Sequence, residues 1–469
     1  MYITQWLKDN HIPETNGMAA HIGRWNGWYN ASNPFYNYTA RDTAKKRTYT
    51  RKRKSLRLPR LICKEWANLI FNERTYISTD NETTNKWIES WSDYIRLYVT
   101  CQDAVELSFW KGTAALVNVI SGVNADDTFS PQAKVEVQLY GADDIFPISW
   151  NNKVCTEAAF RSITYINAKK LTQFLVYKNT PNGYVIEAAY FDKNGSQVDV
   201  EDYLTYYETG SHTPPFALFK PAISNTYDPY SCLGVSVFDD ALGAIQLADE
   251  AFDNMNQDIE LGRKMLALSE TMLRREVTYD NDTGAKLSDN LIVPMETNQC
   301  LFLLGDNSEE YFKEYNPDLR VDDNRRAIQT ALQMLGTVVG FGNEYFNLEG
   351  SSGIRTATEV VAEHSALFRS VRKHENSIAP ALETLVRSAI EMHTYATHNV
   401  VPQPETILVN FDDSVIEDSE AMDKRDRERV AAGLMQPFEY RMKWYGEDEE
   451  TAKALSTPTL ARYDIPEEL

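Results

Sequence analysis

Apolar residues recur at the spacing of one helix face in two segments near the middle of the chain. The first segment spans residues 238–266, where Phe238, Leu242, Ile245, Phe252 and Met255 are separated by steps of three, four and seven. Such steps place these side chains on one side of an α-helix. The other side is acidic and carries Asp239, Asp240, Asp249, Glu250, Asp253, Asp258 and Glu260. A second stripe over residues 320–339 predicts a helix that returns along the first.

The excursion between these two helices, residues 264–318, contains short apolar runs that are typical of strands. Its residues 280–284, Asp-Asn-Asp-Thr-Gly, partly match a calcium-binding loop. The glycine comes one position too early, and Leu291 occupies the twelfth position, where that loop needs an acid. The pattern therefore predicts a hairpin turn.

A glycine-rich segment, residues 340–355, follows the second helix and contains Gly340, Gly342, Gly350 and Gly353. This composition predicts a mobile loop. Thr356 and Glu359 then form the pattern of a capping box, which predicts a long helix over residues 356–395 with a kink at Pro380. A strand over residues 406–411 follows. The tail from residue 412 onward predicts two or three short helices separated by Gly433 and Gly446, and a disordered end.

The N-terminal half mixes helical and strand patterns. A short helix and an aromatic loop, residues 24–39, open the chain, and the loop's aromatic side chains should pack on the body or on a neighbouring subunit. Helical stripes follow at Leu61, Ile62, Trp66, Leu69 and Ile70 and in the segment from residue 85 to about 112. Alternating residues over 113–206 predict an antiparallel sheet, and an extended proline-rich connector leads to Gly234. The predicted fold class is α+β, mostly helical.

A basic run interrupts this half of the chain. Between residues 41 and 64 the charged residues are Arg41, Asp42, Lys45, Lys46, Arg47, Arg51, Lys52, Arg53, Lys54, Arg57, Arg60 and Lys64. Three interpretations stay open: a solvated surface patch, a nuclear localisation signal, and a contact to DNA or to an acidic neighbour.

Composition narrows the class of protein. A length of 469 residues allows two to four compact regions. The net charge of −21 should on average repel nucleic acid. The five cysteines are scattered without a CxxC pair, as expected for buried thiols in a reducing compartment. We expect no membrane span, because no apolar run reaches 18 residues, and the N-terminus does not have the pattern of a secretory signal.

Motifs for catalysis and cofactor binding are missing from the sequence. It has no P-loop, no dinucleotide fingerprint, no nucleophile elbow and no metal-binding spacing of Cys and His. Asp412-Asp413 after the last strand is the best candidate for an acid/base or metal site, but such a pair more often ends a strand. We expect no catalytic residue, no metal and no cofactor.

Three stretches together resemble the portal protein, or head-to-tail connector, of tailed bacteriophages, in the branch found in long-tailed phages of Gram-positive hosts. They are residues 62–77, 233–262 and 340–378. The second resembles the entry to that family's stem helix, and the third resembles its tunnel loop followed by the start of the long wing helix. The acidic tail resembles the family's crown segment.

The resemblance implies a ring, usually of twelve copies, at the unique capsid vertex of the virion, assembled in the host cytoplasm. Double-stranded DNA would pass through the axis. The large terminase, head–tail adaptor, major capsid and scaffold proteins would be partners, and no membrane would be involved. The implied domains are a wing (1–235 and 356–411), a first stem helix (236–263), a clip (264–318), a second stem helix (319–339), a tunnel loop (340–355) and a crown (412–469).

Site residues follow from the same resemblance. The tunnel loop would present Gly340, Phe341, Gly342, Asn343, Glu344, Tyr345 and Phe346 to the DNA, with Phe341, Asn343, Glu344 and Tyr345 nearest the axis. The stem would line the channel with Asp249, Glu250, Asp253 and Asp258. The clip would meet partners through Asp280, Asp282 and Lys286.

Simple geometry permits such a ring. Twelve helices, each about 10 Å thick and placed side by side, form a circle about 120 Å around, which leaves a bore of roughly 28 Å. An acidic wall would repel DNA within a Debye length of about 8 Å and let it slide.

Two other classes stay open. One is a helical scaffold that binds partners through residues 236–262 and 356–395. The other is a carbohydrate-active hydrolase. The 9 Trp and 26 Tyr could stack on sugars and the many acids could supply a carboxylate pair, but no βα alternation supports a barrel.

Overall fold

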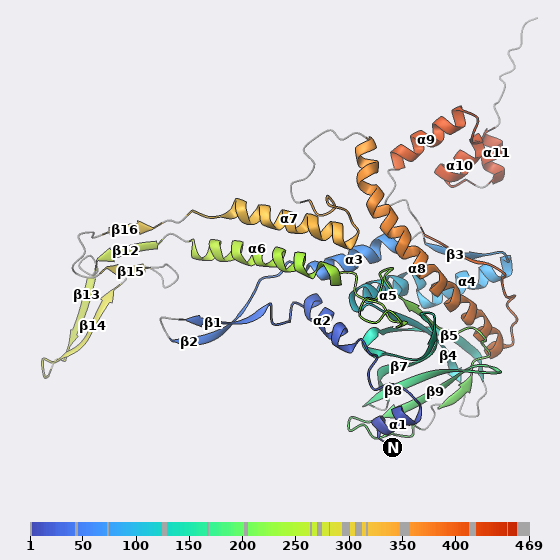
Figure 1. The fold of residues 1–469 in the computed structure, drawn as a ribbon, viewed down its shortest axis with the longest axis horizontal. Coiled ribbons are helices and arrows are strands. Elements are labelled where there is room, and N and C mark those ends of the chain that lie inside the picture. The colour runs from blue at the N-terminus through green and yellow to red at the C-terminus, as the bar shows by residue number, and fades with distance from the viewer. Residues whose placement is uncertain are drawn as a thin grey trace, which may run out of the picture.

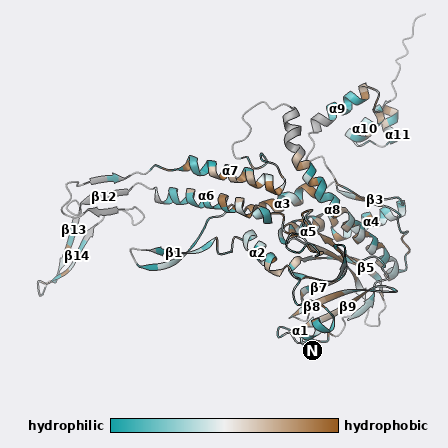
Figure 2. Ribbon diagram, in the orientation of Figure 1, coloured by the Kyte–Doolittle hydropathy of each residue, from teal (hydrophilic) through white to brown (hydrophobic). Residues whose placement is uncertain are grey.

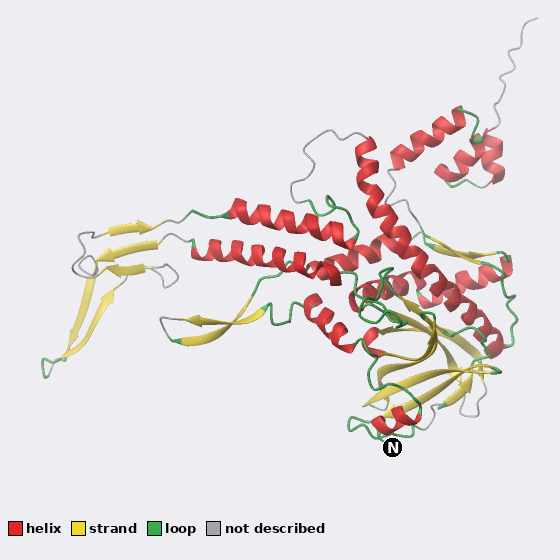
Figure 3. Cartoon of the chain, viewed as in Figure 1, coloured by secondary structure: helices red, strands yellow, loops and turns green. Residues whose placement is uncertain are grey.

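The computed structural model describes residues 2–42, 46–72, 75–123, 129–166, 168–200, 205–262, 265–269, 274–280, 282–292, 301–304, 312–315, 318–347, 357–411, 419–447 and 449–456. A mixed body of helices and sheets carries two long helices that project to one side (Figure 1). A small group of strands lies at the far end of these helices, and three short helices belong to the C-terminal segment (Figure 3).

Two antiparallel sheets form the centre of the body. One has the order β11-β4-β5 and comprises β4 (Ala114–Val123), β5 (Phe129–Gly141) and β11 (Phe216–Phe219). The other has the order β10-β9-β8-β7-β6 and comprises β6 (Ile145–Asn151), β7 (Val154–Ile166), β8 (Lys169–Thr180), β9 (Gly183–Phe191) and β10 (Tyr206–Glu208). The predicted sheet over 113–206 is confirmed. Part of the predicted proline-rich connector forms a strand, because its apolar run from Phe216 pairs with β4.

Within the described residues, six helices belong to the body. They are α1 (Ile3–Asp9), α2 (Ala19–Tyr29), α3 (Leu58–Ile70), α4 (Glu82–Ile95), α5 (Leu97–Lys111) and the 41-residue α8 (Ala357–Thr397). Helices α5 and α8 pack on β4 and β5, and α2 and α3 pack on α5. The predicted helix after the glycine-rich segment is confirmed and continues through Pro380. Its capping box lies outside the described residues. The strand near residue 407 is confirmed as β17 (Ile407–Asn410), which pairs with β3 (Tyr76–Thr79).

The predicted aromatic loop is only partly a loop. Helix α2 occupies its first half, and a hairpin of β1 (Asn37–Asp42) and β2 (Arg47–Lys52), which the sequence did not predict, begins at its end. Trp25, Tyr29 and Tyr36 are buried in the body of the same chain. Their packing partners are therefore intramolecular.

The two predicted long helices are α6 (Leu242–Leu261) and α7 (Val321–Val339), which lie side by side. Helix α6 is shorter than predicted. A 3-10 turn, Asp239–Ala241, precedes it, and Gly262 ends it. A Cβ at Gly262 would lie 2.5 Å from the Asp258 carbonyl oxygen, so the chain can turn there only without a side chain. The predicted extension to residue 266 is wrong, because Met265 already belongs to a strand.

The strands beyond α6 confirm the predicted strand character of the excursion. They are β12 (Met265–Ser269), β13 (Arg274–Tyr279), β14 (Lys286–Ile292), β15 (Leu301–Leu304) and β16 (Phe312–Tyr315). Strand β12 pairs with β15 in parallel and with β16 antiparallel. The hairpin turn at residues 280–284 is confirmed: the Gly284 amide donates to the Asp280 carbonyl oxygen at 2.9 Å.

The C-terminal segment contains α9 (Ser419–Ala431), α10 (Pro437–Tyr445) and α11 (Glu449–Ser456). Gly433 and Gly446 separate these helices as predicted, with φ of 70° and 65°. Asp412-Asp413 and the last thirteen residues, 457–469, lie outside the described part of the chain.

The end of α5 holds the entry to α6. The Ser236 hydroxyl and the Val237 amide both donate to the Phe109 carbonyl oxygen at 2.9 Å, and the Gly234 amide donates to the Thr113 hydroxyl at 2.9 Å. Gly112 ends α5 with φ of +83°, and a Cβ there would lie 2.7 Å from the Gly234 carbonyl oxygen. The absence of a side chain at Gly112 lets the two backbones approach.

We therefore predict that Gly112→Ala destabilises the protein. A left-handed backbone and a clash with immovable backbone should together lower the free energy of unfolding by at least about 2 kcal/mol. Gly23→Ala in α2 is the control, because a Cβ at that position would meet no atom within 4 Å. Urea unfolding followed by circular dichroism should show a lower midpoint for Gly112→Ala alone, and equal midpoints would contradict the prediction.

Candidate functional site

The acidic face of α6 is covered by two N-terminal stretches, residues 33–36 and 51–57. Asp249 is fully buried, with 0% of its surface exposed. Its carboxylate accepts hydrogen bonds from the Tyr36 hydroxyl at 2.5 Å, the Ser55 hydroxyl at 3.0 Å and the Leu56 amide at 2.7 Å. Burial raises the pKa of Asp249 above its ordinary value, and these hydrogen bonds only partly offset that effect. Burial and the neighbouring Asp249 also raise the pKa of Tyr36.

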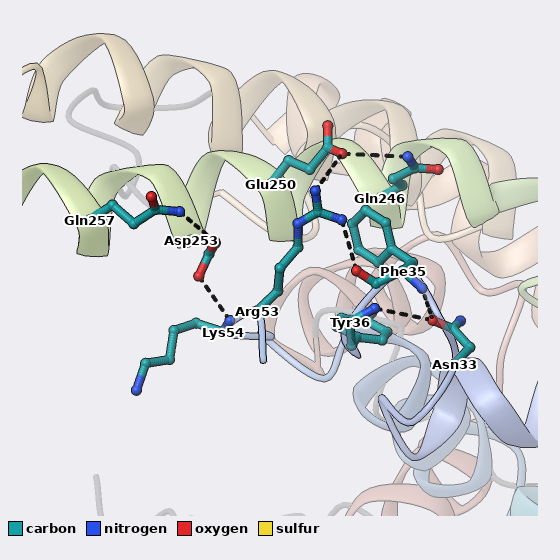
Figure 4. A network of polar contacts seen from close by, with 9 residues as sticks. All are labelled: Asn33, Phe35, Tyr36, Arg53, Lys54, Gln246, Glu250, Asp253 and Gln257. Carbon is teal, nitrogen blue, oxygen red and sulfur yellow. Dashed lines mark hydrogen bonds and ion pairs between the residues drawn. The ribbon is translucent and has the colours of Figure 1, made fainter. Parts of the chain in front are cut away.

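One helical turn further along, Asp253 is also enclosed, with 2% of its surface exposed. It accepts hydrogen bonds from the Lys54 amide at 3.0 Å and from the Gln257 side chain at 2.7 Å, and Arg51 lies 3.8 Å away. The Lys54 side chain itself points away from α6 (Figure 4). Asp253 thus binds the backbone of the basic run, and the Lys54 ammonium group stays exposed.

Arg53 connects the basic run to the more exposed part of the same face (Figure 4). Its guanidinium group lies 3.9 Å from Glu250, donates to the Phe35 carbonyl oxygen at 2.7 Å, and sits over the Phe35 ring at 4.4 Å from the centroid. A planar guanidinium can serve a carboxylate, a carbonyl and an aromatic face together. Glu250 keeps 41% of its side-chain surface exposed, so the ion pair of Arg53 and Glu250 orients the Arg53 side chain but adds little to the stability of the fold.

Asp258, nearer the far end of α6, joins the two long helices. It accepts hydrogen bonds from Arg320 at 2.6 Å and from Asn324 at 3.0 Å. The hydrogen bond from Arg320 lowers the pKa of Asp258. Asp258 thereby links α6 to the first turn of α7.

These contacts correct two of the predicted channel-lining residues. Asp249 and Asp253 cannot line a bore, because both carboxylates are buried under residues of the same chain. Glu250 and Asp258 keep some exposure but already have cationic partners in the protomer. The prediction failed because a helix pattern shows which residues share a face, but not what covers that face.

The same contacts answer the open question of the basic run for its part from Arg51 to Arg57. Residues 51–57 meet an acidic neighbour, and that neighbour is α6 of the same chain. Sequence analysis missed Tyr36, Ser55 and Leu56, which supply the donors. The sequence feature that could have predicted this contact is the presence of both a basic run and an acidic helix face in one chain.

The glycine-rich segment after α7 is more ordered than predicted over residues 340–347. The amides of Phe341 and Gly342 both donate to the Gly336 carbonyl oxygen, at 2.9 and 3.0 Å, so the chain folds back over the last turn of α7. A Cβ at Gly336 would lie 2.1 Å from the Gly342 carbonyl oxygen. Only glycine permits this approach.

Aromatic stacking fixes the folded-back segment to the body. The Phe341 ring stacks on Trp66 of α3 and on Tyr345, with centroid distances of 4.5 Å in both cases. The Tyr345 hydroxyl donates to Glu65 of α3 at 2.9 Å. Phe341 is 2% exposed, so its predicted place nearest the axis is wrong: a buried ring in the core cannot touch a passing ligand.

The rest of this segment divides into two parts. Asn343 is exposed and Glu344 is half-buried, with Asn347 donating to Glu344 at 3.1 Å. Gly340 and Phe346 belong to the packed part, where Phe346 contacts Phe341 edge to face. Residues 348–355, which the sequence also placed in the mobile loop, lie outside the described residues.

The three predicted clip residues lie at or beside the β13–β14 turn. The Asp280 carboxylate accepts hydrogen bonds from the amides of Asp282 and Thr283, at 2.8 and 3.1 Å, and these bonds lower its pKa. Lys286 pairs with Asp289. Asp280 and Lys286 therefore stabilise the hairpin itself, and Asp282 is exposed at its tip.

Within the described ranges, no group of three or more His, Cys, Asp or Glu side chains is arranged to hold a metal ion. No described helix is both long enough and apolar enough to cross a membrane.

The chain was compared with known proteins. A family model described as phage portal protein, SPP1 Gp6-like, matches residues 13–444. No curated protein matches the chain. Among solved structures it is similar to a chain of "Neck of empty GTA particle computed with C6 symmetry", with 10% identity, a TM-score of 0.40, and coverage of 90% of this chain and 92% of that one. A chain of "Neck of native GTA particle computed with C12 symmetry" gives 10% identity, a TM-score of 0.38 and the same coverage, 90% and 92%.

The contacts of Asp249 generate a paired prediction. Asp249→Ala leaves the Leu56 amide and the Tyr36 hydroxyl unsatisfied in a buried place, which should lower the free energy of unfolding by about 2–4 kcal/mol. Asp249→Asn keeps the size and one acceptor oxygen, so its cost should stay within about 1 kcal/mol. Urea unfolding at pH 7 compares the two variants, and equal losses would contradict the assignment.

The raised pKa of Asp249 adds a pH dependence. The folded chain holds this proton to a higher pH than the unfolded chain does. Its stabilising effect is therefore complete below the unfolded pKa of about 4 and is lost as the pH rises through the folded pKa. Relative to Asp249→Asn, which cannot titrate there, the unsubstituted protein should lose stability as the pH rises above about 4. A difference in the free energy of unfolding between the two proteins that stays constant with pH would contradict this prediction.

Proposed function

The chain belongs to the SPP1 Gp6-like family of phage portal proteins, and we propose that it forms a ring at the unique vertex of a phage capsid through which double-stranded DNA enters and leaves. The match over residues 13–444 carries this proposal, since it includes the body, both long helices, the strands beyond them and most of the C-terminal segment. The role is that of a passive conduit without an enzymatic step of its own. A partner ATPase supplies the energy for packaging.

The surface of the two long helices supports assembly. Leu247 and Ile259 of α6 are 42% and 52% exposed, and Met334 and Val338 of α7 are 54% and 52% exposed. Apolar side chains on helices that project from a body are typical of surfaces covered by another copy. In the proposed ring, α6 and α7 of each copy form the stem, and these side chains pack between neighbouring stems.

The proposed ring is large enough for DNA. Twelve stems with helices about 10 Å thick leave a bore of roughly 28 Å. The wall is not lined by Asp249 or Asp253, which are buried. Weak adhesion to DNA then rests on the net charge of −21 per copy rather than on one acidic helix face.

The remaining parts take the roles implied by the family. The strands of residues 264–318 form the clip, which faces the large terminase and later the head–tail adaptor, with Asp282 on the exposed turn. The body forms the wing, which contacts the major capsid and scaffold proteins, and the segment from residue 412 forms the crown inside the head. The three stretches 62–77, 233–262 and 340–378 favour the branch found in long-tailed phages of Gram-positive hosts.

The tunnel loop is proposed to constrict the channel. Phe341, Tyr345 and Phe346 hold its first part on α3 and on one another. Asn343 is exposed, Glu344 is half-buried and Tyr345 keeps 37% of its surface exposed, so these are the described side chains of the loop that can touch DNA.

The first test is the assembly state. The purified protein should form rings with an axial hole in negative-stain images and have a native mass near twelve times 53.6 kDa. A stable non-ring dimer, both alone and with scaffold protein, would contradict the proposed function and favour a helical scaffold.

The second test concerns the loop. Combined Asn343→Ala and Glu344→Ala substitutions remove two polar side chains without touching the aromatic stack, so rings should form normally while DNA packaging into procapsids falls several-fold. Asn194→Ala, on an exposed turn of the body, is the control. Unchanged packaging by the loop variant would contradict a DNA contact at these residues.

A further inference from the structure

The hairpin formed by β1 and β2, residues 37–52 and here called the arm, projects from the body toward the same side as α6 (Figure 1). Its two strands pair in register from Asn37↔Lys52 to Asp42↔Arg47 and belong to a two-stranded sheet. Arg47, Thr48, Tyr49 and Thr50 are all exposed, although alternate residues of a strand point to opposite faces. Neither face of the outer arm is therefore covered by the described parts of its own chain.

An uncovered hairpin is a costly element. An isolated pair of strands is at best marginally stable in water, and both edges present unpaired backbone groups. The arm is hydrophilic along most of its length (Figure 2). Such an element is stabilised when a second surface packs on it.

Its direction is set at the base. Tyr36, just before β1, is bonded to Asp249, and Arg51 and Lys54, at the end of β2, contact Asp253. Both ends of the hairpin are thus held by two buried carboxylates one turn apart on α6. The arm leaves α6 in a fixed direction.

The two faces of the arm differ in chemistry. One face carries the cross-strand pairs Tyr38↔Arg51, Ala40↔Tyr49 and Asp42↔Arg47, so that an uncharged strip of Tyr38, Ala40 and Tyr49 lies between charged residues. The other face carries the pairs Asn37↔Lys52, Thr39↔Thr50 and Arg41↔Thr48 and is polar and basic. Together they fit a surface that combines apolar and acidic side chains.

The stem of a second copy offers such a surface. Its exposed residues include the acids Glu260, Asp322 and Asp323 and, beside them, the apolar residues Leu319 and Val321. Because the arm projects toward the same side of the body as α6 of its own chain, rotation about a ring axis would bring it near the level of the next stem. We propose that the arm lies on the stem of the neighbouring copy and clamps adjacent stems together, an inference that rests on the ring of the proposed function.

Double-stranded DNA is the other acidic partner to consider. Phosphate contacts need cations but no uncharged strip, and Tyr49, with 48% of its surface exposed, would stay uncovered on a phosphate backbone. Arg51 and Arg53 are already paired with Asp253 and Glu250. The protein surface is therefore the better fit.

Site-specific cross-linking tests the contact directly. A photoreactive phenylalanine analogue replaces Tyr49 in assembled rings, and mass spectrometry identifies the cross-linked peptide. We expect covalent dimers in which position 49 is joined to residues 242–261 or 321–339 of a second copy. Cross-links only within one chain, or to DNA in filled particles, would overturn the proposal.

A charge-reversal set tests the energetics. Arg41→Glu, Lys46→Glu and Lys52→Glu together alter exposed arm residues that do not hold its base. The matched control reverses three exposed lysines of the body, Lys169→Glu, Lys170→Glu and Lys193→Glu, with the same change in net charge. The arm variant should raise the protein concentration at which rings half-dissociate by tenfold or more, while the control should change it less than threefold.

The outcomes separate the two proposals. Equal ring stability of the arm variant and the control would overturn the arm contact and leave the ring intact as a proposal. Absence of rings from the unsubstituted protein, with or without scaffold protein, would overturn the proposed function and the arm contact with it. Circular dichroism of both variants checks that the body is folded.

Discussion

The buried carboxylate of Asp249 is the interaction on which the arrangement of this protein depends. A carboxylate removed from water is costly unless its oxygens are fully hydrogen-bonded. Here residues almost 200 positions away or more supply three donors, from Tyr36, Ser55 and Leu56. The requirement to satisfy one acid on α6 therefore orders the N-terminal segment, holds the basic run and sets the direction of the arm.

This use of charge changes how the acidity of the protein should be understood. Much of the acidic face of α6 serves internal contacts, first with residues 51–56 and then, through Asp258, with Arg320 and α7. A net charge of −21 describes the chain as a whole, but it does not say which acids meet solvent or a cargo. The polar network fixes the position of α6 on the body. The aromatic stack of Trp66, Phe341 and Tyr345 fixes the end of α7 on the body.

Close backbone approach is the second constraint. Gly112 lies against Gly234 where the chain enters the stem, and Gly336 lies against Gly342 where it leaves. Both junctions join a long helix to the body, and both would clash if a single carbon were added. The start of α6 and the end of α7 are thus both held at the body by contacts that only glycine allows.

By itself, the sequence determined the elements whose pattern is local. Apolar steps of three and four predicted α6, α7 and α8, alternation predicted the antiparallel sheets, and the turn at residues 280–284 was predicted from its glycine. The family resemblance was also present in the sequence, because it rests on the order and spacing of segments. Tertiary structure alone decided which acids of α6 are buried, that β1 and β2 form an arm, and that Phe341 packs inward. These outcomes depend on pairs such as Tyr36 with Asp249 and Trp66 with Phe341, which lie hundreds of residues apart, and no periodicity along the chain encodes such a contact.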